Sequence, residues 1–347
     1  MIRFLLTAAC ALALSAPAAS AQVPYARFDE APAAPAADDA ANTAWRSWSA
    51  RSAAALAATG QPRELAFAAL LRGLTSQGSA MPGSDGPSQA GSGDAQAAAW
   101  RLDAAARAGE DTLANALLSY DRDAAIRIRA AQRWLGAEPR NLAPLLVRGG
   151  GVDALLADAR GATRFDLGML PQVRWMHAAL LRTPPSAAER AAFAAAGEFV
   201  VAEHAAIQAM SLWGAVALPA LQPLMTGCDA SALAGNPVRA RDCRHVGAVM
   251  AEASDTMLGQ LIGLALLDRL AETPGERADV QARRRTLDWR NLEWGRASAA
   301  LPRDGAGQLV RLLADTSIAS EPQLVERALG EAGIALEPPA GWRAPEP

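Results

Sequence analysis

The stretch DRDAAIRIRAAQRWLGAEPRN, residues 121–141, contains one complete helix with its start and its stop. Asp123 is placed as the N-cap, because an aspartate side chain accepts hydrogen bonds from the free N–H groups of a first helical turn. Pro139 ends the pattern, because proline cannot continue a helix. Between them apolar side chains recur at helical spacing, at Ile126, Ala130, Ala131 and Trp134. The stretch therefore predicts a helix with one buried face, followed by a turn.

Patterns of the same kind fill most of the chain from about residue 43 to 336. Its commonest residues are strong helix formers, and no convincing two-residue alternation predicts a strand. Residues 42–60 and 61–74 predict two helices joined at Gly60 as a hairpin, and residues 95–109 and 111–120 predict a second pair. We therefore expect an all-α fold, with antiparallel helix hairpins stacked in one extended domain.

Ser186 and Glu189 have the spacing of a capping box, in which each side chain bonds the other residue's backbone N–H. An apolar sequence follows them as far as Gly214. It predicts one long helix.

The stretch AAQRWLGAEPRNLAPLL, residues 130–146, resembles the end of a tetratricopeptide repeat. It contains a helix of small residues, a turn at Pro139 to Asn141 and the start of a new helix. Each predicted helix pair spans about 30 residues, close to the 34 of such repeats. The resemblance covers about 60 residues around Pro139. It implies a solenoid of helix hairpins with a partner-binding groove, and it implies no catalytic residues.

The first 21 residues have the pattern of a secretory signal peptide. Arg3 precedes an apolar run, and Ala19-Ser20-Ala21 is a small-residue cleavage site. We expect cleavage after Ala21 and export, to a Gram-negative periplasm or beyond the cell. No other stretch approaches about 18 uninterrupted apolar residues, so we expect no integral membrane segment after cleavage.

Three segments lack a helical pattern. Residues 22–42 are rich in alanine, proline and aspartate and predict a disordered leader, and residues 77–94 are rich in glycine and serine and predict a disordered loop. The proline-punctuated residues 337–347 predict a flexible tail. The helical domain is therefore expected at residues 43–336.

Charge and composition exclude several functions. The chain has a formal net charge of −3, and removing Arg3 with the signal peptide makes it −4. This mildly negative charge does not favour binding to nucleic acid. Every basic residue other than histidine is arginine. A Schiff base, a phosphate-loop lysine and a Ser-Lys dyad are therefore impossible. The sequence implies no cofactor.

Cys228 and Cys243 are the two cysteines that remain after cleavage, and 14 residues separate them. A zinc site would need three or four ligands in close pairs, and a thiol oxidoreductase would place its cysteines two residues apart. His245 lies two positions from Cys243, and positions i and i+2 do not share a helix face. In an oxidising compartment an even cysteine count favours a disulfide. We expect Cys228 and Cys243 to form a structural bond across an inter-helix loop.

Two functional hypotheses remain. The first is an exported helical-repeat protein that binds or scaffolds a protein or peptide partner without catalysis. The alternative is a cell-envelope hydrolase with a site on the predicted long helix, built from Glu198, Glu203 and His204, because histidine beside glutamate could act as a general base. His245, Ser254 and Asp255 have the residue types of a catalytic triad, but no Gly-x-Ser-x-Gly turn presents a nucleophile.

Overall fold

The computed structural model describes residues 36–76, 94–197, 199–217, 219–300 and 305–345. The expected signal peptide and Glu198 lie outside these ranges, as do residues 22–35 of the expected leader and 77–93 of the expected loop. The regular structure of the described residues is helical, as predicted, and β-structure is limited there to isolated bridges between single residues. The first nine helices are α1 (Ala36–Ala58), α2 (Pro62–Ser76), α3 (Ala95–Arg107), α4 (Thr112–Leu118), α5 (Ala124–Ala137), α6 (Ala143–Arg148), α7 (Val152–Ala159), α8 (Met169–Leu181) and α9 (Ala187–Ala196). The others are α10 (Val201–Val216), α11 (Gln222–Gly227), α12 (Ala230–Leu233), α13 (Pro237–Ala253), α14 (Met257–Arg269), α15 (Pro274–Ala300), α16 (Gly305–Ala314) and α17 (Glu321–Glu331).

Helix α5 confirms the prediction made from residues 121–141. The Asp123 side chain accepts hydrogen bonds from the backbone N–H groups of Ala125 and Ile126, and α5 ends at Ala137, two residues before Pro139. The buried residues are the four of the predicted apolar face, Ile126, Ala130, Ala131 and Trp134. Local sequence therefore determines both ends and the orientation of this helix.

Helix α1 begins at Ala36, inside the range expected to be leader, and contacts α2 across Gly60. Gly60 has a φ of 69°, a left-handed conformation that glycine adopts without strain. Asp94, the last residue of the range expected to be a disordered loop, caps α3 through the N–H groups of Gln96 and Ala97. Residues 36–42 of the expected leader are therefore helical, and Asp94 of the expected loop is an ordered helix cap.

The expected long helix after Ser186 is wrong. The long helix predicted from Ser186 to Gly214 is two helices, α9 and α10, whose axes are bent by 79°. The capping box of Ser186 and Glu189 is present as predicted. The helix ends at Ala196, and the bend lets Phe193 of α9 stack on Phe199 with their ring centroids 4.6 Å apart. Helix α9 therefore ends with Gly197 as its C-cap, a residue type that commonly stops helices, and the aromatic rings pack across the bend.

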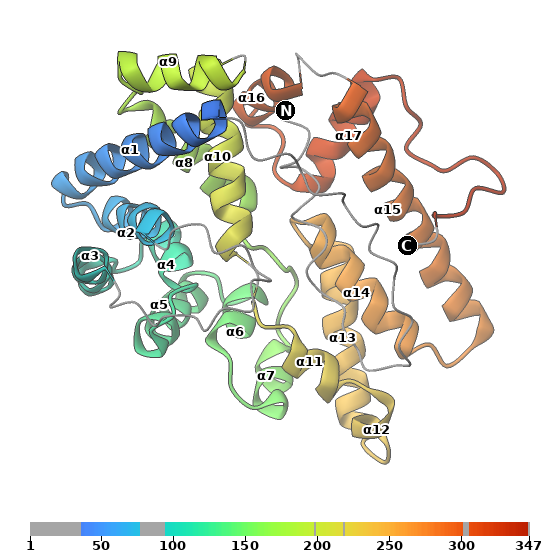
Figure 1. Ribbon diagram of the computed structural model, residues 1–347. Coiled ribbons are helices and arrows are strands. Elements are labelled where there is room, and N and C mark those ends of the chain that lie inside the picture. The colour runs from blue at the N-terminus through green and yellow to red at the C-terminus, as the bar shows by residue number, and fades with distance from the viewer. Residues whose placement is uncertain (1–35, 77–93, 198, 218, 301–304, 346–347) are drawn as a thin grey trace.

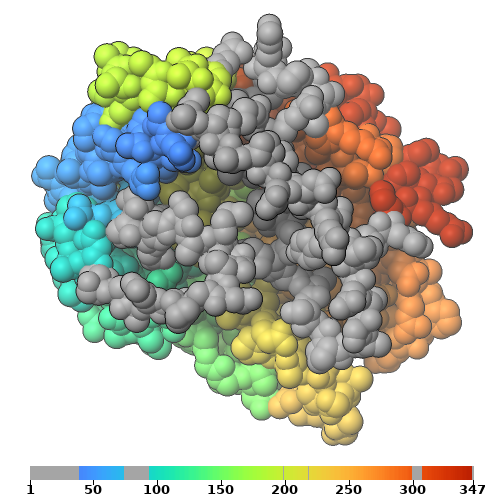
Figure 2. All heavy atoms as spheres, viewed as in Figure 1, coloured from blue at the N-terminus to red at the C-terminus, as the bar shows by residue number. Residues whose placement is uncertain are grey.

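The helices form two groups with a central pair between them (Figure 1). Helices α1 to α5 lie on one side, α13, α14, α15 and α17 lie on the other, and α8 and α10 lie between. Figure 2 shows these two groups, blue to teal and orange to red, at opposite sides of the same view. Consecutive helices pack together from α1 to α6, but α9 also packs on α1 and α16 packs on α10.

A continuous apolar core joins both groups. It extends from Trp48 and Phe67 near the N-terminus to Leu324 and Ala328 in α17, all nearly inaccessible to solvent. Arg174 of α8 strengthens the junction, because its guanidinium donates hydrogen bonds of 2.7 Å to the carbonyls of Leu313, Asp315 and Ile318. The two groups of helices are therefore held by one core.

Cys228 and Cys243 form a disulfide, as expected from their number. Cys228 caps the C-terminus of α11, and Cys243 lies within α13, which begins at Pro237 and not near Cys243 as expected. Both cysteines are fully buried. The bond therefore fixes the α11–α12 connection against the first half of α13.

We expect removal of this disulfide, in a Cys228→Ala/Cys243→Ala variant, to lower the free energy of unfolding by about 3 kcal/mol, because the closed loop of about 15 residues restricts the unfolded chain. Urea unfolding of both proteins measures the difference. Mass spectrometry after alkylation without reductant should find neither cysteine modified. Modification of both would contradict the assignment.

The segment from Glu337, expected to be a loose tail, makes specific contacts as far as residue 345 is described. Trp342 packs edge-on against Trp289 of α15 with their ring centroids 5.4 Å apart. Arg285 donates a 2.8 Å hydrogen bond to the Pro339 carbonyl. Residues 334–342, which we call the C-terminal strap, therefore lie along α15.

Candidate functional site

The structure does not bring the predicted catalytic residues Glu203 and His204 together. His204 of α10 lies in an aromatic cluster of Trp45, Trp48, Phe193 and Phe199, with ring centroids 4.7–6.0 Å from its own. The Glu203 side chain reaches α16 instead, where a Cβ placed on Gly307 would lie 3.2 Å from its Oε1 atom. Adjacent residues of a helix point about 100° apart, which explains this divergence. Glu198 lies outside the described residues.

The surroundings of His204 are those of a packed core side chain. Its Nε2 atom is buried and has no hydrogen-bond partner among the described residues. Burial lowers the pKa of His204 to about 4. Its imidazole is therefore neutral near pH 7, and the ring contacts recorded for it among the described residues are all with aromatic side chains.

We expect His204→Leu to reduce the pH dependence of stability. The unfolded chain binds a proton at this residue near pH 6.5, whereas the folded protein binds one only near pH 4. The resulting penalty on folding is absent above pH 6.5 and grows as the pH falls towards 4. Between pH 7.5 and 5 the variant should lose about 2 kcal/mol less stability than the wild type. Urea unfolding at both pH values tests this, and equal losses would contradict it.

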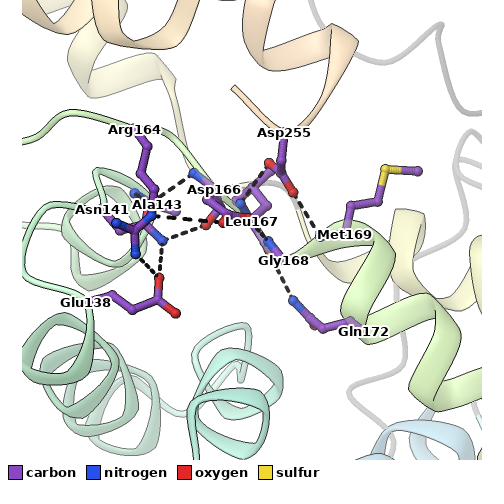
Figure 3. A network of polar contacts seen from close by, with 10 residues as sticks. All are labelled: Glu138, Asn141, Ala143, Arg164, Asp166, Leu167, Gly168, Met169, Gln172 and Asp255. Carbon is purple, nitrogen blue, oxygen red and sulfur yellow. Dashed lines mark hydrogen bonds and ion pairs between the residues drawn. The ribbon is translucent and has the colours of Figure 1, made fainter. Parts of the chain in front are cut away.

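The most connected polar region surrounds residues 164–168, between α7 and α8 (Figure 3). This segment forms single parallel bridges to Asn141 on one side and to Ser254 on the other. The Asn141 side chain donates to the Asp166 carbonyl at 2.7 Å and accepts from the Asp166 N–H at 3.0 Å. The segment therefore joins the α5–α6 turn to the α13–α14 junction, two regions far apart in sequence.

Asp255 anchors this segment from the α13–α14 junction (Figure 3). Its two carboxylate oxygens accept hydrogen bonds of 2.8 and 2.9 Å from the backbone N–H groups of Leu167 and Met169. Burial, and then the neighbouring Asp166 carboxylate, raise the pKa of Asp255 to about 7, while the two N–H groups act in the opposite direction. Its backbone carbonyl accepts from the Glu321 N–H at 2.9 Å. Asp255 thus ties α8, α14 and α17 together.

A small cleft opens beside this network. It has a volume of about 180 Å³. Most of its lining is apolar, and four polar residues contribute to its wall, one each from α4, the connection after α5, the connection before α8, and α8. The lining residues are Thr112, Leu113, Ala116, Trp134, Glu138, Asp166, Gly168, Pro171 and Gln172. The cleft therefore lies between α4, α5 and the start of α8.

Its charge is negative. Glu138 Oε2 forms an ion pair of 2.9 Å with Arg164 and also accepts from the Asn141 side chain. Asp166 lies 4.0 Å from the same guanidinium, and its Oδ1 atom accepts from the Gly168 N–H. Two carboxylates thus share one arginine, and Asp255 lies buried behind them. The cleft is electrostatically suited to a cation or to a hydrogen-bond donor.

Two buried polar atoms of the lining residues lack partners among the described residues. They are Oε1 of Gln172 and Nε1 of Trp134. Both side chains are 2% exposed. The Gln172 Nε2 atom, by contrast, donates to the Leu167 carbonyl at 2.6 Å. The Tyr120 side chain lies within hydrogen-bonding reach of Gln172, and the Oε1 atom is inaccessible to solvent. This amide oxygen therefore does not by itself indicate a bound ligand.

Sequence reasoning missed this site. Glu138 lies in the repeat-like stretch of residues 130–146, a resemblance that implies no binding role for it, and Asp166 lies in an irregular connection. Asp255 was considered only as a triad residue type. Periodicity within one segment cannot show that residues 138, 166 and 255 meet, because tertiary packing alone brings these segments together.

The described residues contain no group of three or more histidine, cysteine or acidic side chains that could hold a metal ion. None of the described helices alone has the length and hydrophobicity to cross a membrane. The bent pair α9 and α10 together has the length and composition of a membrane span. Comparison of the chain with protein-family models, curated proteins and solved structures gave no match.

Proposed function

We propose that this protein is exported and binds a protein or peptide partner, and that the cleft between α4, α5 and α8 receives one basic side chain of that partner. The observation that supports this most directly is the pair of carboxylates on the cleft wall, Glu138 and Asp166, which share the single guanidinium of Arg164. A guanidinium or ammonium group donates several hydrogen bonds and carries the complementary charge.

The size of the cleft favours a single side chain. Pockets for drug-sized ligands and cofactors have volumes of about 300–1,000 Å³. The cleft, at about 180 Å³, is smaller than this range. A protruding side chain of a larger partner matches this volume, with the rest of the partner outside. The indole of Trp134 on the wall adds a surface that attracts cations.

The arrangement of the helices is also part of the proposal. We propose that α1 to α6 form a short stack of hairpins similar to tetratricopeptide repeats. Contacts between each consecutive pair from α1 to α6 support it. The stack does not extend over the whole chain, because each repeat of a solenoid contacts only its neighbours, whereas α1 packs on α9 and α10 packs on α16. The cleft lies where this stack meets α8.

Photo-crosslinking in cells tests the binding site. A photoreactive residue at Leu113, which lines the cleft, should give a covalent adduct with the partner. The matched control is Leu102 of α3, which is 59% exposed and outside the cleft. Glu138→Gln should reduce the adduct at position 113, because it removes one cleft charge, whereas Asp103→Asn, a similar charge loss on α3, should not. Equal adducts at positions 113 and 102, or no adduct at 113, would contradict the proposal.

Export is tested separately. The proposal places the mature N-terminus at Gln22 and the protein in the periplasm or outside the cell. N-terminal sequencing of the natural protein after cell fractionation should find Gln22 first and no cytosolic pool. A cytosolic protein that retains residues 1–21 would contradict it.

A further inference from the structure

A second hollow lies on the other side of the molecule, between α14, α15 and the C-terminal strap. Its volume is about 370 Å³, within the range of small-ligand pockets. The floor consists of the buried side chains of Ala251, Leu264 and Leu287. The remaining lining residues are Gln260, Ala282, Arg283, Thr286, Arg290 and Glu337. An apolar floor beside two guanidinium groups is suited to a ligand with an apolar body and an anionic head.

The strap places a carboxylate at the edge of this hollow. Glu337 accepts a 2.8 Å hydrogen bond from the Thr286 hydroxyl and lies 3.4 Å from a terminal nitrogen of Arg290. The Glu337 side chain is nevertheless 72% exposed. It therefore lies at the edge of the hollow, and its contacts show that the groups of this wall accept a carboxylate.

The two arginines differ in how firmly they are bound. Arg290 donates to the Leu336 carbonyl at 3.0 Å and pairs with Glu326 at 2.7 Å, in addition to Glu337. The contacts of Arg283 with the described residues are long, 3.5 Å to Glu252 and 3.4 Å to the Ala251 carbonyl. Its side chain is 41% exposed. The donors of Arg283 are thus the ones that a ligand can recruit at least cost to existing bonds.

We propose that this hollow binds a carboxylate with a short apolar chain. The carboxylate pairs with Arg283, whose planar donors match its two oxygens, and the chain covers Leu264 and Leu287. Glu337 competes for the same wall through its negative charge. A medium-chain fatty acid and an apolar C-terminal residue of a peptide share this chemistry.

Calorimetric titration of the full mature protein tests the proposal. Octanoate should bind more tightly than octanol, which lacks the charge, and than acetate, which lacks the chain. N-acetyl-leucine serves as the peptide arm, and the tighter of the two carboxylates identifies the source. If neither carboxylate binds, or if octanol binds as tightly as octanoate, the proposal is wrong.

Two variants are expected to change octanoate affinity in opposite directions, and a third is the control. Arg283→Gln should weaken octanoate binding at least tenfold, and Glu337→Gln should strengthen it several-fold, an effect that misfolding cannot produce. Arg284→Gln is the control, because Arg284 lies on the same helix and pairs with Asp288 but does not line the hollow. Unchanged affinity in both Arg283→Gln and Glu337→Gln would overturn the assignment. The hollow and the cleft share no residue, so this result is independent of the proposed partner site.

Discussion

Replacing Asp255 by alanine is expected to lower the free energy of unfolding by about 4 kcal/mol. The change leaves the N–H groups of Leu167 and Met169 without acceptors, and each unsatisfied buried donor costs roughly 1–3 kcal/mol. Leu167 and Met169 are nearly inaccessible, so water cannot replace the lost bonds without opening the core. Urea unfolding monitored by circular dichroism measures the difference.

The Asp255→Asn variant separates the hydrogen bonds from the charge. One amide oxygen remains as an acceptor, so the loss should be smaller than for alanine. Because burial raises the pKa of Asp255 to about 7, the wild-type side chain contributes most at low pH, and this contribution is lost as the pH rises from about 4 through 7. From pH 5 to 8 the wild type should therefore lose about 3 kcal/mol relative to Asp255→Asn. A difference that does not change with pH would contradict the raised pKa.

The second large effect is expected at Gly263, where α14 crosses α13. A Cβ atom there would lie 2.3 Å from the backbone nitrogen of Ala251 and 2.7 Å from the carbonyl oxygen of Gly247. Both are backbone atoms, so the steric clash of the added Cβ can be removed only if the two helices move apart. We expect Gly263→Ala to cost more than about 3 kcal/mol, above the usual cost of overpacking by one methyl group.

Gly214→Ala is the matched control for this substitution. Gly214 lies in α10, is exposed, and has no atom within 4 Å of an added Cβ. Alanine should stabilise the protein there by about 0.5 kcal/mol, because it restricts the unfolded chain and favours the helix. Urea midpoints of both variants test the crossing. If Gly263→Ala is as stable as Gly214→Ala, α13 and α14 do not pack as closely as described.

These two positions show where sequence-based prediction ends. The sequence predicts that α13 and α14 meet near Ser254 and Asp255, and they do. It does not show that Gly263 must lack a side chain, because that requirement comes from the backbone of another helix. Nor does it show that Asp255 accepts hydrogen bonds from a segment 86 residues away.

The same division applies to the candidate site. Trp134 is predicted as buried from helical periodicity, and it is. That it lines one cleft with Asp166 and Gln172 follows only from tertiary packing. His204 is the converse case, because it has the residue type of a catalyst and lies in an aromatic cluster.

The sequence alone determined the all-helical class, the caps at Asp123 and Ser186, and the pairing of Cys228 with Cys243. The helical class and the caps depend on residue type and on spacing within one or two helical turns. The cysteine pairing depends on there being two cysteines after cleavage. Tertiary structure alone decided the burial of Asp255 and the positions of the cleft and the hollow. These features depend on contacts between segments that are distant in sequence. Such contacts produce no periodic pattern in the sequence, so periodicity cannot predict them.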